Sequence, residues 1–459
     1  MAETLVVRSP FDGSEVGTVP SHTGADVDKA VAIAKTALHT APLPAWKRAE
    51  ILDKTAHLLA GRIEEFARTI AMEAAKPIKT ARIEATRAIS TFTFAATEAR
   101  KLTGETVPIE ASEVGEGKLA FAVRVPVGVV GAISPFNFPL NLVAHKIAPA
   151  IAAGCPVVLK PASQTPLSAI NLAKLVVEEA GLPSEWLHVL PGKASEVGNA
   201  ITDNPDIPYI TFTGSPDVGW GIRQRAFKKK VGLELGNNAP LIIEPDGDWA
   251  TAAKKVSVAG FSHAGQSCIS TQRIYVHADV ADDFLGELVP LVEKLVVGPP
   301  MDENTDVSSL ISEGDRDRVA EWIDEAAGEG AQVLTGGKVE GSLLLPTVLS
   351  GVSPDMKVCR EEVFGPVVGV QTYTDFDDAL RLANDTKYGL QAAVYTANLG
   401  KAIQAARTLD FGGVLVNEMP TWRADQMPYG GLRDSGNTRE GPAYAVHEMT
   451  ELRLVVVQP

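Results

Sequence analysis

Cysteine is scarce in this sequence, with three residues in 459. So few cysteines, and an odd number of them, exclude the disulfide framework that stabilises many small secreted domains. The eight histidines show neither the HxxxH nor the HExxH spacing of a metal site, and no CxxC pair is present. We therefore expect neither a disulfide-bonded fold nor a bound metal.

Long hydrophobic runs are also missing. The longest candidate, LVAHKIAPAIAAGCPVVLK at residues 142–160, is interrupted by His145, Lys146 and two prolines. It falls short of the roughly 18 apolar residues of a membrane-spanning helix. The N-terminal MAETLVVRSPFDG lacks the basic region and apolar core of a secretory signal. We expect a cytoplasmic protein with no membrane partner.

Positive charge is in deficit, because 42 Lys and Arg stand against 57 Asp and Glu, for a net charge of −15. This balance argues against nucleic acid or an anionic membrane as the main partner and favours solubility. The 45% of hydrophobic and 22% of charged residues are ordinary for globular proteins. The length suits two or three domains.

The order of the expected elements predicts an α/β fold. The first 105 residues carry apolar residues at helical spacing, as in residues 25–38 and 48–75, whereas residues 118–134 alternate like a strand pair or a long ribbon. Short apolar runs then alternate with helical stretches, first at PVVLK, LHVLPG and YITFTG and again in a second series from Gly236 onward. Such alternation is typical of parallel strands with crossover helices.

We therefore expect two doubly wound α/β domains and a protruding β element formed by residues 115–130 and 448–459. The terminal strand, MTELRLVVV, has no obvious partner nearby in the sequence. An exposed strand of this kind often pairs with another subunit. The sequence thus predicts a homodimer or homotetramer.

One cysteine has unusual neighbours. Cys155 opens a buried strand and Cys359 lies in a charged segment, but Cys268 lies in the small, polar run FSHAGQSCIS at the end of a helical stretch. This setting alone favours a reactive thiol only weakly over a structural cysteine.

Two stretches could bind a nucleotide. In YITFTGSPDVGW a strand runs into Gly214 and then a helix, an arrangement that can hold a phosphate but serves equally as a packing turn, and the GxGxxG fingerprint is absent. In VVLKPASQTP, Lys160 ends a buried strand and could donate to a ribose or a phosphate, or simply cap the strand in solvent.

Three further polar residues stand in apolar surroundings. Asn137 in PFNFP is either a turn residue or a fixed donor to a developing oxyanion. Glu234 in GLELG is either paired with a cation or a general base with a raised pKa. Glu362, with Phe364, suits a ribose and a flat ring, although a loop salt bridge would also explain it.

The ordered set PFNFP, LKPA, FTGSxxVG, LELG, GQSC, EEVFGP and MPYGG resembles the NAD(P)-dependent, Cys-nucleophile aldehyde dehydrogenase superfamily over nearly the whole chain. EAAKPIKTARIEATRA and TWRADQMPYGGLRDSGNTREGPAYAVHEMTE are similar to the branch of lactaldehyde and non-phosphorylating glyceraldehyde-3-phosphate dehydrogenases. The resemblance implies a Rossmann-like dinucleotide-binding domain (1–114 and 131–235), a catalytic domain (236–430), an oligomerisation element (115–130 and 448–459) and a return segment (431–447).

The resemblance also implies roles for individual residues. Cys268 would be the nucleophile, Glu234 the general base, and Asn137, with the Cys268 backbone N–H, the oxyanion hole. Lys160 would bind the adenosine ribose, Gly214 and Ser215 the pyrophosphate, and Glu362 and Phe364 the nicotinamide side. The cofactor, NADP or NAD, would be held by Ser134, Pro135, Lys160, Ser163, Gly192, Gly214, Ser215, Val218, Gly236, Glu362 and Phe364.

Three positions depart from the family pattern. Asn237 replaces the second glycine of LELGG, and Ser163 replaces an adenosine-side glutamate that disfavours NADP, although Ser163 could also simply cap the next helix. Ser267 precedes the cysteine, where some relatives that take phosphate- or phosphonate-bearing aldehydes have arginine. We therefore expect a small, neutral or hydroxylated aldehyde, with Arg82, Arg87, Ser267 and Arg423 as candidate substrate residues.

Several alternatives remain open. Lactaldehyde, glyceraldehyde 3-phosphate, succinic semialdehyde and phosphonoacetaldehyde are all candidate substrates. A CoA-acylating aldehyde dehydrogenase would generally lack Glu234, and a non-catalytic nucleotide-binding module would have little use for Cys268 and Asn137. A Cys–His hydrolase built on His263 and Cys268 would leave the nucleotide motifs unexplained.

Overall fold

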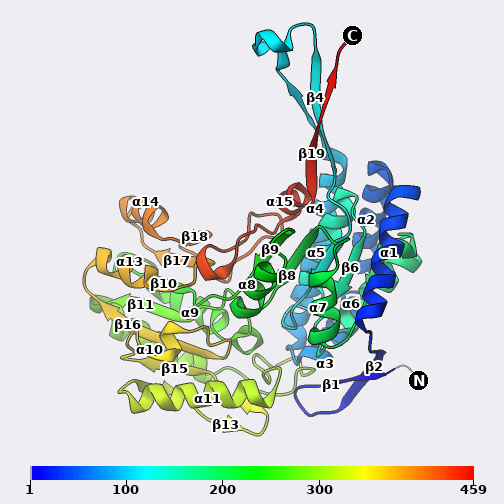
Figure 1. Ribbon diagram of the computed structural model, residues 1–459. Helices are drawn as coiled ribbons and strands as arrows, with labels where there is room; N and C mark the ends of the chain where they lie inside the picture. The colour runs from blue at the N-terminus through cyan, green and yellow to red at the C-terminus, as the bar shows by residue number, and fades with distance from the viewer. Residues whose placement is uncertain (1–2) are drawn as a thin grey trace.

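Two α/β bodies and a projecting arm make up the computed structural model, which describes residues 3–459 (Figure 1). Each body is built on its own largely parallel sheet, and a small three-stranded sheet forms the arm. The expected fold class, two doubly wound α/β units with a protruding β element, is confirmed.

The N-terminal part is mainly helical, as expected. Its helices are α1 (Gly24–Thr40), α2 (Ala45–Ala60), α3 (Ile63–Ala74) and α4 (Ile78–Lys101). They are preceded by an antiparallel hairpin of β1 (Thr4–Arg8) and β2 (Glu15–Pro20), which the sequence analysis missed. Alanine-rich faces of α2 and α4 pack on α5 (Asn141–Ala153), so the helices form one hydrophobic core with the first sheet.

The first sheet has the strand order β7-β6-β5-β8-β9, and all its pairs are parallel. Its strands are β5 (Val130–Ile133), β6 (Val157–Lys160), β7 (Leu187–Val189), β8 (Tyr209–Thr213) and β9 (Lys230–Glu234). The helices α6 (Leu167–Lys174), α7 (Asn199–Asp203) and α8 (Pro216–Arg225) connect them. Because parallel strands share one carboxyl edge, Ser134, Lys160, Gly214 and Glu234 all fall at that edge.

The second sheet has the order β12-β15-β16-β11-β10-β17-β18, with only the β12–β15 pair antiparallel. Its strands are β10 (Pro240–Ile243), β11 (Arg273–His277), β12 (Gln332–Thr335), β15 (Thr347–Ser350), β16 (Val367–Tyr373), β17 (Gln391–Tyr395) and β18 (Gly413–Val416). Its helices are α9 (Trp249–Ala259), α10 (Ala281–Glu293), α11 (Glu313–Gly328), α12 (Lys357–Arg360), α13 (Phe376–Asn384) and α14 (Leu399–Thr408). A short hairpin, β13 (Val339–Glu340) and β14 (Leu343–Leu344), lies beside this sheet, and α15 (Pro442–Glu448) leads back toward the arm.

The arm corrects two expectations. Residues 118–134 do not form one strand pair or ribbon, because β4 (Leu119–Pro126) belongs to the arm and β5 belongs to the first sheet. The terminal strand β19 (Thr450–Val457), which has no partner nearby in the sequence, pairs antiparallel with β4 along its whole length. β3 (Glu105–Val107) completes this sheet, so the protruding element begins at Glu105 rather than at residue 115.

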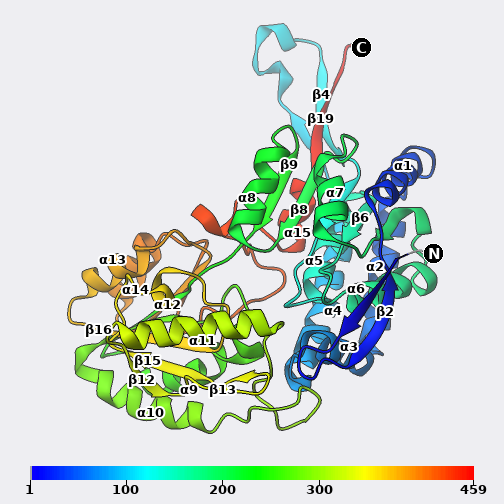
Figure 2. The same cartoon turned by 60° about the horizontal axis from the view of Figure 1, so that its bottom comes forward.

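The arm stands clear of both bodies in both views (Figures 1 and 2). β19 is its outer strand, and Leu452, Leu454 and Val456 are exposed there. An apolar strand with one open edge is therefore presented to solvent.

Candidate active site

A cavity of about 370 Å³ opens between the two bodies and is lined by eight of the expected site residues. Residues expected at the site that line it are Pro135, Asn137, Gly214, Ser215, Gly236, Cys268, Glu362 and Phe364. The lining also includes residues for which the sequence analysis made no prediction: Phe136, Leu142, Ala162, Thr213, Leu235, Asp315 and Arg318.

A left-handed turn brings Cys268 to the cavity. After α9 ends, His263, Ala264 and Gly265 take φ values of 52°, 53° and 69°. A side chain on Gly265 would begin 2.0 Å from the Gly365 carbonyl oxygen, so only glycine fits. This turn redirects the chain so that the thiol faces the cavity.

The Cys268 thiol is held in an apolar setting. Its Sγ lies 2.9 Å from the Tyr429 hydroxyl, and Ile269, Leu390 and Met427 pack around it. Burial raises the pKa of the Cys268 thiol to about 12. The thiol is therefore protonated in the free protein at neutral pH, and its reaction requires a group that takes the proton.

His263 is not that group. Its ring packs edge-on against Phe138, and neither ring nitrogen has a hydrogen-bond partner. Burial lowers the pKa of His263 well below its usual value, and the Lys76 ammonium lowers it further. Because the Cys268 thiol contacts Tyr429 instead, the geometry does not support a Cys–His hydrolase.

Asn137 and the cysteine segment are joined directly. The Asn137 side-chain Nδ2 donates to the Gln266 backbone oxygen at 2.9 Å. A side-chain amide has two N–H groups. Within residues 3–459, the Asn137 amide makes no hydrogen bond other than the one to Gln266. The second N–H group is thus available to a ligand in the cavity.

Glu234 ends β9 and has an unusual carboxyl group. It is buried, and neither carboxyl oxygen has a hydrogen-bond partner. A side chain on Gly430 would begin 2.7 Å from Glu234 Oε1, which places this carboxyl beside the residue that follows Tyr429. Burial, and then the negative charge of Glu440, raise the pKa of Glu234 well above its usual value.

Glu440 is the ionised partner in this pair of carboxyls. Although burial alone would raise its pKa, the Arg423 guanidinium and the Lys146 ammonium lower the pKa of Glu440 to about 2. Arg423 Nη2 donates to Glu440 at 2.9 Å, and Lys146 Nζ lies 3.7 Å from it. Two neighbouring carboxyls with pKa values pushed apart are typical of an acid–base site.

Two cofactor candidates at the edge of the first sheet, Lys160 and Ser163, do not line the cavity. Lys160 is buried, its Nζ donates to the Pro161 carbonyl at 3.0 Å, and no carboxylate pairs with it among residues 3–459. Burial lowers the pKa of Lys160 to about 8. Ser163 Oγ donates to the Gly192 carbonyl at 2.9 Å and does not cap α6.

Two further cofactor candidates, Ser134 and Val218, follow the strands β5 and β8 of the first sheet. The Ser134 hydroxyl is buried without a hydrogen-bond partner. Val218 lies on the first turns of α8 and is 53% exposed. Gly219, by contrast, serves packing, because a side chain there would begin 2.5 Å from Leu235.

Glu362 and Phe364 line the cavity from the second body. Glu362 Oε1 accepts from the Asn237 backbone N–H at 2.9 Å, and burial raises the pKa of Glu362 to about 7. Gly236 allows this close approach, since a Cβ there would lie 2.3 Å from Glu362 Oε2. The Phe364 ring meets Phe136 edge to face at 5.9 Å, with the Phe364 backbone at a φ of 50°.

The candidate substrate arginines differ in position. Arg82 lies on the surface between Glu64 and Glu303, paired with both, and does not line the cavity. Arg87 donates to Asp425 at 2.8 Å.

Arg423 is nearer to the thiol. Its guanidinium carbon lies 3.7 Å from the centre of the Tyr429 ring, and its Nε has no hydrogen-bond partner. Ser267 is half-buried and directly precedes Cys268.

Three residues around the site were missed by the sequence analysis. Tyr429, in the MPYGG motif, contacts the thiol, and its place in that motif was the available signal. Glu440 has no motif of its own, and neither does Arg318, which lines the cavity on α11 and donates to the Val363 carbonyl at 3.0 Å. Only the folded chain brings these two residues to the site.

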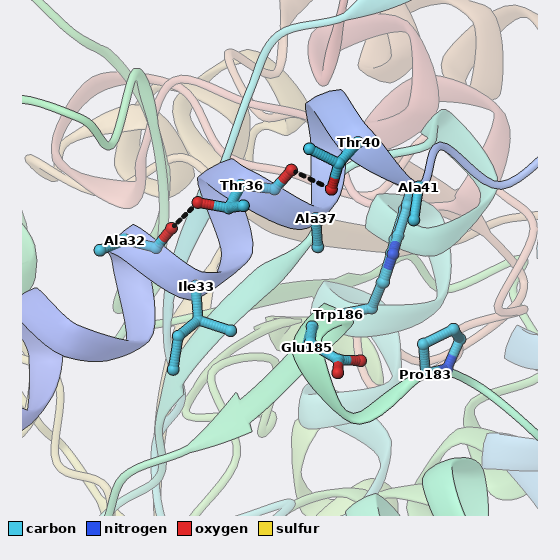
Figure 3. Close-up of a pocket in the computed structure, with 9 residues that line it drawn as sticks. All are labelled: Ala32, Ile33, Thr36, Ala37, Thr40, Ala41, Pro183, Glu185 and Trp186. Atoms are coloured by element: carbon cyan, nitrogen blue, oxygen red, sulfur yellow. Dashed lines mark hydrogen bonds between the residues drawn. The ribbon is translucent and has the colours of Figure 1, made fainter.

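A separate cavity of about 480 Å³ lies between α1 and η4 (Ser184–Trp186), as Figure 3 shows. The hydroxyls of Thr36 and Thr40 donate to carbonyl groups of their own helix. The cavity therefore offers mainly apolar surface and no nucleophile.

Residues 3–459 contain no group of three metal-ligating side chains. In the same part of the chain, no helix has both the length and the apolar character needed to span a membrane.

Comparisons with known proteins address the family of the chain. The model of the aldehyde dehydrogenase family matches residues 1–455. A 3-sulfolactaldehyde dehydrogenase of Priestia aryabhattai is 48% identical, over 99% of this chain and 95% of that protein. A lactaldehyde dehydrogenase of Methanococcus aeolicus is 40% identical, over 99% of this chain and 97% of its own length. The NADP complex of the glyceraldehyde-3-phosphate dehydrogenase GapN from Methanocaldococcus jannaschii is 37% identical and superposes with a TM-score of 0.95 over the full length of both chains.

Proposed function

The chain belongs to the aldehyde dehydrogenase family and is an NAD(P)-dependent oxidoreductase, and from this premise we propose that it oxidises a small hydroxylated aldehyde to its acid through a thioester on Cys268. Two observations carry the proposal: Cys268 and Asn137 line one cavity, and the unpartnered carboxyl of Glu234 lies beside Gly430, the residue after the Tyr429 that contacts the thiol.

Each of these groups has a distinct task. The Cys268 thiol releases its proton to water in the cavity and the resulting thiolate attacks the aldehyde carbon, while the Asn137 Nδ2–H and the Cys268 backbone N–H stabilise the developing oxyanion. When bound, the nicotinamide cofactor accepts the hydride. Glu234, in its ionised form, then takes a proton from the water that hydrolyses the Cys268 thioester.

The residues along the carboxyl edge of the first sheet fit a dinucleotide. Gly214 and Ser215 lie at the N-terminus of α8, where backbone N–H groups favour a pyrophosphate. Lys160 is a buried cation without a carboxylate partner, which suits a ribose or a phosphate. Glu362 would accept hydrogen bonds from the nicotinamide ribose, beside the Phe364 ring.

The charge balance near the thiol limits the substrate. Asp425 pairs with Arg87, Glu440 with both Arg423 and Lys146, and Asp315 with Arg318, so each of these cations faces a carboxylate. A dianionic phosphate needs several uncompensated donors to replace its hydration. We therefore propose a substrate with at most one negative charge, such as lactaldehyde or 3-sulfolactaldehyde, and no direct part for Arg82.

A panel of aldehydes tests this proposal. Lactaldehyde, 3-sulfolactaldehyde, succinic semialdehyde, phosphonoacetaldehyde and glyceraldehyde 3-phosphate are assayed for reduced cofactor, with and without CoA. We expect kcat/KM for lactaldehyde or 3-sulfolactaldehyde to exceed that for glyceraldehyde 3-phosphate by at least about tenfold, equivalent to one mismatched buried charge. A clear preference for the phosphorylated aldehyde would contradict the substrate proposal, and a requirement for CoA would replace hydrolysis by acyl transfer to CoA.

Cofactor choice gives a second prediction. Because Ser163 carries no charge and Lys160 has no carboxylate partner, we expect NADP to be used well. In Ser163→Glu, the added carboxylate repels the 2′-phosphate and lowers kcat/KM for NADP by about ten- to a hundredfold, on the scale of an unmet buried polar group. Kinetics with NADP and NAD at constant aldehyde measure the change.

Ser163→Gln is the matched control, because glutamine has the size of glutamate without its charge. We expect it to alter the NADP-to-NAD ratio far less than Ser163→Glu does. Rejection of NADP by the wild-type protein, or equal effects of the two substitutions, would show that charge at position 163 does not set the preference.

The arm and the cysteines support two further proposals. We propose a homodimer or homotetramer in which the open edge of β19 contacts another copy, because Leu452, Leu454 and Val456 are exposed there. We also propose a cytoplasmic location, since all three cysteines are free thiols, as a reducing compartment keeps them.

A further inference from the structure

A buried ion pair lies close behind the active site. Lys76 follows α3, Glu84 lies on α4, and both side chains are completely buried. Neither side chain lines the cavity, and the mechanism proposed above uses neither. Burying two charges is costly unless further contacts satisfy them, so the partners of this pair indicate what it holds in place.

Glu84 holds the beginning of α5. One carboxylate oxygen accepts from Lys76 Nζ, and the other accepts from the backbone N–H groups of Leu140 at 2.9 Å and Asn141 at 3.2 Å. A carboxylate at this place satisfies unpaired N–H groups of the first helical turn and complements the helix dipole. The carboxyl end of the PFNFP loop is thereby fixed to α4.

Lys76 holds the middle of the same loop. Its Nζ lies 3.6 Å from the centre of the Phe138 ring, within the range of a cation–π contact. Phe138 directly follows Asn137, and its ring also meets the His263 ring at 6.3 Å, edge to face. His263 belongs to the left-handed turn that leads to Cys268. The ammonium group therefore supports both segments that carry the proposed oxyanion donors.

We propose that the Lys76–Glu84 ion pair positions the Asn137 amide relative to the Cys268 backbone N–H, so that both donors point at one oxyanion. The inference rests on the proposed function, which assigns these donors to the oxyanion. Lys76 and Glu84 are positioning residues, since they act through Phe138 and the start of α5. Misplacing such donors by about 1 Å is enough to slow catalysis by about a hundredfold.

Glu73 provides a matched control on the neighbouring helix α3. Its side chain is completely buried, and its two carboxylate oxygens accept from the N–H groups of Leu167 at 2.7 Å and Ser168 at 2.9 Å, at the start of α6. It thus caps a helix as Glu84 does, but it contacts neither Phe138 nor the start of α5.

The test measures the rate constant of the pre-steady-state burst of reduced cofactor, which reports acylation and hydride transfer. We expect Lys76→Met and Glu84→Gln to lower it by about 10- to 100-fold, without change in the dissociation constant of NADP or in the rate of Cys268 alkylation by iodoacetamide. Glu73→Gln should lower thermal stability and leave the burst rate constant at the wild-type value.

A double-mutant cycle with Asn137→Ala separates positioning from general destabilisation. If the pair acts through the Asn137 amide, Lys76→Met should cause no further loss in the Asn137→Ala background, because effects through a shared group are not additive. Where Lys76→Met or Glu84→Gln does not fold, Phe138→Leu keeps the ion pair, removes its contact with the loop, and should give the same selective loss.

The outcomes separate the two proposals. If Asn137→Ala slows the burst but the pair variants do not, or if the effects are additive, or if Glu73→Gln slows the burst equally, the positioning role is overturned and the proposed function stands. If Asn137→Ala leaves the burst unchanged, the oxyanion role of Asn137 fails and the positioning role fails with it.

Discussion

Cys268→Ala abolishes aldehyde oxidation and leaves cofactor binding intact. The thiol lines the cavity together with Asn137, and a methyl group cannot form the thioester. We expect kcat to fall by at least about 10⁴-fold, as when a covalent nucleophile is removed from other enzymes. The proposed contacts of the cofactor come from other segments, so a fluorescence titration with NADPH should give an unchanged dissociation constant.

Cys359→Ala is the matched control for this variant. Cys359 is also a free, largely buried thiol, but it lies on α12 and does not line the cavity. We expect it to oxidise aldehydes at the wild-type rate. Near-normal activity of Cys268→Ala, or equal losses in the two variants, would rule out Cys268 as the nucleophile.

The sequence predicted those parts of the fold that depend on local pattern. Apolar runs such as PVVLK and YITFTG became β6 and β8, because a strand buried on both faces has a distinctive composition. Residues that directly follow such strands could then be assigned to one sheet edge, as for Lys160 and Gly214.

Pairing between distant segments could not be predicted in the same way. β4 and β5 are adjacent in sequence and similar in composition, yet they join different sheets, and β19 closes on β4 from the far end of the chain. The order of apolar and polar residues along a strand indicates which of its faces is buried, but not which strand lies beside it. This is why the sequence identified no partner strand close to the terminal strand.

The electrostatics of the site also depend on contacts between distant segments. The sequence suggested a raised pKa for Glu234 from its apolar neighbours, and burial is indeed the main cause. Glu440, which raises that pKa further, and Lys146 and Arg423, which oppose it, come from three separate segments. Arg82 was expected at the site, but its ion pairs with Glu64 and Glu303 hold it on the surface.

Glu234→Gln should separate the two halves of the reaction. The glutamine amide cannot take a proton from water, so hydrolysis of the Cys268 thioester should slow by about 10²- to 10⁴-fold, the usual contribution of a general base. Acylation and hydride transfer do not need this base, and stopped-flow traces should therefore show a burst of about one reduced cofactor per active site, followed by slow turnover.

The pH profile and an added nucleophile make this prediction sharper. Because burial and Glu440 raise the pKa of Glu234, the carboxyl is protonated at low pH, and the wild-type hydrolysis rate should rise with pH as the base form appears. Glu234→Gln should lose this rise, because it has no group to ionise.

Hydroxylamine cleaves a thioester without help from a general base, so it should restore turnover in Glu234→Gln and affect the wild type little. Equal slowing of the burst and of the steady state, with no rescue, would instead place Glu234 in the acylation half of the reaction and leave thioester hydrolysis to another base.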